Sequence, residues 1–85
     1  MKRINTFADI QIKEIGNPMI VIYSNPSDYP GYFVARVWDL DKPTEIFMLK
    51  KDVHRIREDI KNNMPKMVRL PRAKNDDPCI VETWF

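Results

Sequence analysis

The sequence has few of the residues that form disulfides, bind metals or cradle phosphates. Among its 85 residues are one cysteine, Cys79, one histidine, His54, and two glycines, Gly16 and Gly31. A single cysteine excludes an internal disulfide framework or a multi-cysteine metal site, and it favours a reducing compartment. Two isolated glycines exclude the glycine-rich loops that hold nucleotide phosphates. No apolar run approaches the roughly 20 residues that span a bilayer. We therefore expect a cytoplasmic protein without metal or cofactor.

Catalytic residue patterns are equally scarce. His54 lies off the apolar line of the expected helix, where we expect it to be exposed. Cys79 begins an expected strand, where we expect a buried structural thiol rather than a nucleophile paired with His54. Asp76, Asp77 and Glu82 lack the ligand spacing of a calcium loop, so the two aspartates are expected to cap a turn. These patterns predict a protein that is not an enzyme.

Length and composition indicate a single globular domain over residues 1–85. Hydrophobic residues make up 44% of the chain and charged residues 31%, which is typical of a soluble folded domain. Isoleucine, valine and the aromatic residues greatly outnumber leucine and alanine. Because β-branched and aromatic side chains favour strands, the composition predicts a chain that is mostly sheet.

Alternating and continuous apolar runs predict several strands and one helix. Val53, Ile56, Ile60 and Met64 have helical spacing, with Asp52 as a capping residue and Pro65 as a stop. Pro30 and Gly31 fit the centre of a type II turn. The expected strands cover residues 7–15, 19–24, 32–39, 45–49, 67–70 and 79–84.

This order of elements predicts an α+β fold. Its core would be an antiparallel sheet of four to six strands, in roughly β-β-β-β-α-β order, with one amphipathic helix packed on one face. The residues expected beneath the helix are Ile20, Ile22, Phe33, Ala35 and Val37.

The opposite sheet face is the first candidate for a binding surface. Tyrosine, tryptophan and arginine are enriched at interface hot spots, and a bare face of this kind would be large for a monomer. We expect it to bind a protein partner or a second copy of the chain, as a homodimer. In the alternative, the N-terminal arm or the 71–78 loop covers this face and makes a second small core. The residues expected to bind the partner are Tyr23, Tyr32, Arg36, Trp38 and Trp84, with Val21, Val34 and Phe47 beside them.

The uneven charge distribution supplies the second candidate surface. Residues 50–74 carry a net charge of +6, between segments of −1 and −3. A basic segment of this kind is typical of a nucleic-acid-binding surface. Pairing of Asp76 and Asp77 with Arg69 or Arg72 inside the loop is the structural alternative. The residues expected to contact phosphates in the second hypothesis are Lys61, Lys66, Arg69, Arg72 and Lys74.

One segment resembles a known family. Residues 31–40 read Gly-Tyr-Phe-Val-Ala-Arg-Val-Trp-Asp-Leu and are followed by an expected strand and helix. This run resembles HicB-type antitoxins, small bacterial domains with a β-β-β-α-β core, over about half of the chain. The resemblance implies an antitoxin-like regulatory domain, which belongs with the nucleic-acid-binding hypothesis.

Overall fold

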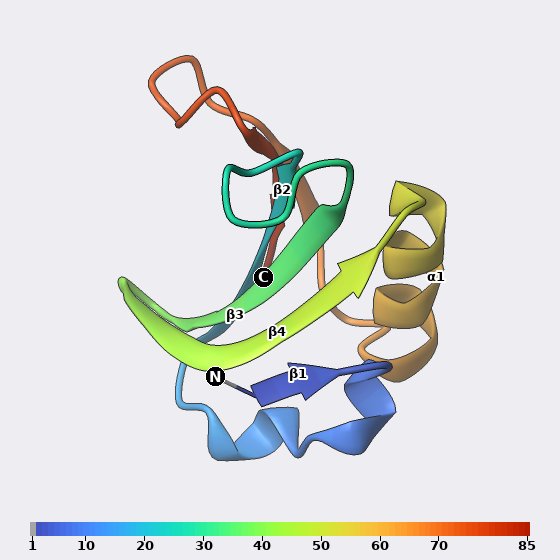
Figure 1. The fold of residues 1–85 in the computed structure, drawn as a ribbon. Helices are drawn as coiled ribbons and strands as arrows, with labels where there is room; N and C mark the ends of the chain where they lie inside the picture. The colour runs from blue at the N-terminus through green and yellow to red at the C-terminus, as the bar shows by residue number, and fades with distance from the viewer. Residues whose placement is uncertain (1) are drawn as a thin grey trace.

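A six-stranded sheet with one helix on one face forms the body of the molecule (Figure 1). The computed structural model describes residues 2–85, and the predicted α+β class is confirmed. The strands lie in the order β1-β4-β3-β2-β6-β5, and every neighbouring pair is antiparallel except β1 and β4. The elements are β1 (Lys2–Ile4), β2 (Pro18–Ser24), β3 (Phe33–Asp39), β4 (Lys42–Lys50), α1 (Val53–Asn63), β5 (Arg69–Pro71) and β6 (Ile80–Trp84).

Helix α1 forms where the sequence predicted it and buries Ile56, Ile60 and Met64 of the predicted line, while Val53 is half-buried. The Asp52 carboxylate accepts the His54 N–H at 2.9 Å, and Met64 donates its N–H to the Ile60 carbonyl at 2.7 Å. These bonds satisfy backbone groups that a helix end otherwise leaves unpaired. Ile56, Ile60 and Met64 belong to one buried cluster with Ile20, Ile22 and Val37. The helix-side core is therefore confirmed.

The strand predicted over residues 7–15 is wrong. This segment forms two short 3-10 helices, η1 (Phe7–Asp9) and η2 (Ile12–Glu14), and the edge position beside β4 belongs to β1. Phe7 is 2% exposed, and its N–H donates to the Asp59 carboxylate of α1 at 2.8 Å. Residues 7–15, the N-terminal arm, therefore close the helix-side core, and it is β1 before them that extends the sheet.

The loop between β2 and β3 lies on the side of the sheet away from α1 (Figure 1). The predicted type II turn is present: Tyr32 donates its N–H to the Tyr29 carbonyl at 3.2 Å, and Gly31 has φ of 82°. The Tyr29 and Phe47 ring centroids are 5.6 Å apart, so the loop packs on β4. This contact covers part of the face expected to be bare.

The two edges of the sheet are short. Strands β1 and β5 have three residues each, and they carry Lys2, Arg3, Arg69 and Pro71. Charged residues and proline at an edge disfavour pairing with a further strand. Among residues 2–85, no helix has the length and apolar character needed to cross a membrane.

Candidate functional site

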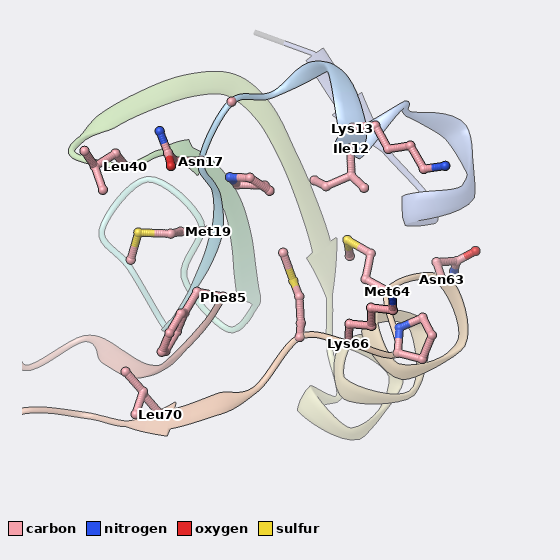
Figure 2. Close-up of a pocket in the computed structure, with 14 residues that line it drawn as sticks. Ile12, Lys13, Asn17, Met19, Leu40, Asn63, Met64, Lys66, Leu70 and Phe85 are labelled. Carbon is pink, nitrogen blue, oxygen red and sulfur yellow. The ribbon is translucent and has the colours of Figure 1, made fainter.

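An apolar groove lies at the end of the sheet where β2 begins and β6 ends (Figure 2). It has a volume of about 860 Å³ and is bounded by the N-terminal arm, the β3–β4 turn, the end of α1 and the C-terminal residues. Figure 2 shows Met19, Leu40, Leu70 and Phe85 along one side, and Ile12, Met64 and Lys66 along the other. Pockets of roughly 300–1,000 Å³ hold drug-sized ligands, so the groove has room for several large side chains.

The groove exposes large apolar side chains that the fold does not bury. Leu40 is 59% exposed, Phe85 51% and Leu70 46%. Met19, Met64 and Met67 line the same groove. Methionine is flexible and polarisable, and it is common on surfaces that adapt to a partner. Exposed apolar side chains gathered in one groove are typical of an interaction site.

Leu40 adopts a backbone conformation that does not suit leucine. Its φ is 56°, at the turn between β3 and β4. The other residues with positive φ among residues 2–85 are Gly31 and Asn25, residue types that tolerate this region. Asn25 also accepts the Gly31 N–H at 2.7 Å, which gives its conformation a local purpose. The Leu40 N–H donates to the Asn17 carbonyl at 2.8 Å, so this turn is also bonded to the segment that begins β2. Leu40 thus combines an exposed apolar side chain with a backbone conformation that is unfavourable for leucine.

The charge of the groove has one sign. Of its lining residues within 2–85, Lys13 and Lys66 are charged, and no carboxylate lines it. Both lysines lie on the side that Ile12 and Met64 form (Figure 2). The groove therefore offers a long apolar wall facing a wall with cations.

The face predicted to be bare is largely covered, and its cover is not the expected one. Val34 is 7% exposed and Phe47 5% exposed, beneath the 25–32 loop that carries Tyr29. Neither the N-terminal arm nor the 71–78 loop supplies this cover, because the arm packs against α1 and the second loop projects away from the sheet (Figure 1). The alternative is therefore right that this face is covered, and wrong about both of the segments that it names as the cover.

Of the remaining residues of that face, Val21 is buried, and Tyr23, Tyr32, Arg36 and Trp38 are half-buried. Arg36 donates from Nε to the Thr44 carbonyl at 3.0 Å, beside the bulge in β4. The Tyr32 ring lies 5.4 Å from the Lys51 ammonium. Burial raises the pKa of the Tyr23 hydroxyl, and the Trp38 indole and the Arg36 charge offset this in part. The Trp38 N–H has no hydrogen-bond partner of good geometry within residues 2–85.

Trp84 is not on this face. It is 4% exposed and packs in the helix-side core, opposite Ile20 of β2. Its expected place beside Tyr23 and Trp38 is therefore wrong. The physical reason is a buried carboxylate, Glu82, which is 1% exposed on the same face of β6 and accepts the Trp84 indole N–H at 2.6 Å.

Arg57 of α1 compensates the negative charge of buried Glu82. Its Nη2 donates to Glu82 Oε1 at 2.6 Å and its Nε to Oε2 at 3.1 Å, while Arg69 Nη1 lies 3.5 Å from Oε1. Burial alone would raise the pKa of Glu82, but the hydrogen bonds from Arg57 and Trp84 and the charges of Arg57 and Arg69 hold that pKa below its ordinary value. The network ties β6, β5 and α1 together.

The basic residues of the second hypothesis do not form one surface. Lys61 and Arg69 line a hollow between α1 and β5, together with Arg57, whereas Lys66 lines the apolar groove. Arg72 donates to the backbone carbonyls of Asp76 and Asp77 at 3.0 and 3.4 Å, and Lys74 is exposed on the same loop. The expected pairing of Arg72 with the aspartate carboxylates is thus replaced by pairing with their carbonyls.

The remaining candidate residues are His54, Cys79, Asp76 and Asp77. His54 is exposed, as predicted, whereas Cys79 is half-buried rather than buried in the core. Asp76 accepts the Ala73 N–H and Asp77 accepts the Cys79 N–H, both at 2.9 Å, which confirms the expected capped turn. No three potential metal ligands come together within the described chain.

Sequence reasoning missed the apolar groove because its lining comes from six separate segments. No linear pattern joins Ile12, Met19, Leu40, Met64 and Phe85. One local signal was available, because Leu40 stands between Asp39 and Asp41 at a turn where glycine or asparagine is expected. Comparison of the chain with protein-family models, with curated proteins and with solved structures finds no match, so the resemblance to HicB-type antitoxins gains no support.

Proposed function

We propose that this chain is a cytoplasmic, non-enzymatic binding module that holds a segment of a partner protein in the apolar groove. The observation that carries the proposal is Leu40, an exposed leucine in a left-handed conformation at the rim of the groove. Such a conformation costs a non-glycine residue about 1–2 kcal/mol. A leucine kept there at a cost to folding is explained by contact with a partner.

The remaining features of the groove agree with this role. Leu70 and Phe85 add exposed apolar surface, and Met19, Met64 and Met67 add surfaces that repack easily. A few large side chains at the centre of an interface carry most of its binding energy. Leu40 and Phe85 are the anchors that this arrangement supplies.

The aromatic face supports the proposal less well than the groove does. Val34 and Phe47 are already buried there, and Arg36 is bonded to the backbone of β4. The groove is therefore the surface on which we place the partner, in preference to the one that the sequence favours.

The test is selection of peptides from a random displayed library on the wild-type protein, followed by mapping of their binding site. Labelled methionine methyl groups report directly on the groove, because Met19, Met64 and Met67 line it. Met48 is fully buried in the core and serves as the internal control. We expect selected peptides to shift the three groove signals and leave the Met48 signal in place.

Two results would contradict the proposal. One is a library that yields no binder. The other is a set of binders that shift the Met48 signal, or none of the groove signals, which would place the binding surface elsewhere.

A further inference from the structure

We infer that the partner segment is an amphipathic α-helix with carboxylates along one flank. This inference rests on the proposed function and adds the conformation and the charge of the partner. Three observations carry it: the sign and position of the charges in the groove, the state of the sheet edges, and the side chains that line the groove.

The charges indicate an acidic partner. Lys13 and Lys66 both lie on the side of the groove formed by Ile12 and Met64, and no carboxylate within residues 2–85 lines the groove to neutralise them. The opposite wall of Met19, Leu40 and Phe85 is apolar. An occupant that matches both walls places carboxylates on one side and large apolar groups on the other. Charges of this kind orient a partner and speed its association, and faster association at an unchanged dissociation rate lowers the Kd.

The same charges disfavour a second copy of the chain as the occupant. A symmetric pair places the same patch of both copies in contact. Each copy would bring Lys13 and Lys66 to that contact, with no carboxylate of the groove to receive them. Like charges brought together at an interface are costly, so the groove selects a different molecule.

The sheet edges disfavour an extended partner. Val68 and Phe85 exchange backbone hydrogen bonds at 2.8 and 3.1 Å, so by alternation the backbone groups of Arg69 face the open edge of β5. The next outward position belongs to Pro71, which has no N–H to donate. With so short a row of free groups, strand addition beside the groove has little to bond to.

The lining of the groove favours a helix over a proline-rich segment. Proline-rich ligands dock in grooves lined by aromatic residues, whereas amphipathic helices dock in apolar grooves through side chains at i, i+3 or i+4, and i+7. Phe85 is the aromatic residue of this groove within the described chain, and Met19, Met64 and Met67 are among the apolar residues that line the rest of it. A methionine-rich groove of about 860 Å³ suits two or three large side chains from one helical face.

The experiment uses a displayed library of about 14 randomised residues, which is roughly four helical turns. Selected peptides are synthesised in their original form and with every Asp and Glu changed to Asn and Gln. Affinities are measured against the wild-type protein, a Lys13→Glu and Lys66→Glu double variant, and a Lys74→Glu control. Lys74 is exposed on the β5–β6 loop and does not line the groove. Circular dichroism follows the peptide on binding.

We expect the selected peptides to carry helical apolar spacing and net negative charge, and to gain helicity when bound. Binding should weaken about tenfold in the lysine double variant or with neutralised peptides, and stay unchanged in Lys74→Glu. Peptides that shift the groove methionines but are basic, neutral or extended would overturn this inference and leave the proposed function standing. Failure of any peptide to reach the groove would overturn both.

Discussion

Trp84 donates its indole N–H to the Glu82 carboxylate at 2.6 Å, two residues earlier on the same face of β6. This bond lies in the core beneath α1, where Glu82 is 1% exposed. A buried carboxylate is tolerated only when it is paired and hydrogen-bonded, and Arg57 supplies the balancing charge from the helix. The pair therefore shapes the stability of the whole domain.

Glu82→Gln should lower the free energy of unfolding by about 2 kcal/mol at neutral pH, because it leaves Arg57 without its partner. Arg57 is a quarter exposed, so water recovers part of the loss. The pKa of Glu82 is lowered in the folded state, so its stabilisation is fully present above the unfolded value of about 4.3 and is lost as pH falls through the folded pKa. Urea denaturation at pH 7 and at successively lower pH values measures both effects. Parallel wild-type and variant curves across the acidic range would contradict the account.

Replacing each tryptophan with phenylalanine should show that the two indole groups contribute differently to stability. Trp84→Phe removes a donor from buried Glu82, whereas Trp38→Phe removes an N–H that makes no hydrogen bond of good geometry in the described chain. We expect Trp84→Phe to cost about 1–3 kcal/mol more than Trp38→Phe. Thermal denaturation of the two variants makes the comparison, and equal losses would show that the Glu82 bond adds nothing.

The free protein should be a monomer at tens of micromolar. Its sheet edges are short and carry Lys2, Arg3 and Pro71, and its groove brings only cations to a symmetric contact within residues 2–85. Sedimentation velocity measures this directly. A dimer that Trp38→Glu dissociates would restore the aromatic face as the interaction surface.

Much of the fold could be predicted from the sequence because its elements follow simple periods. The line Ile56, Ile60 and Met64 and the alternation in β3 each point one face to the core. The strand prediction for residues 7–15 failed because Ile10 and Ile12 alternate as in a strand, although they pack against the core from the end of η1 and the start of η2. No local pattern reveals that β1 has taken the place beside β4.

The prediction of the sheet face for Trp84 failed for a similar reason. Glu82 shares its face of β6 with Trp84, and a glutamate in an alternating strand normally indicates the solvent side. That indication fails because Arg57, 25 residues away in the chain, pairs with Glu82 across the core. The groove could not be predicted from the sequence for the same reason, since its walls come together only after folding.

Measuring the stability and the peptide affinity of a Leu40→Gly variant tests the central claim most directly, because this change separates folding from binding. Glycine adopts positive φ without strain, although it adds freedom to the unfolded chain, so we expect a net gain of roughly 0.5–1 kcal/mol in unfolding free energy and a melting temperature several degrees higher. The same change removes an exposed anchor from the groove, so peptides selected on the wild-type protein should bind at least about tenfold more weakly. A variant that is more stable and binds less well is the predicted result. A variant that binds the same peptides with unchanged affinity would contradict the account.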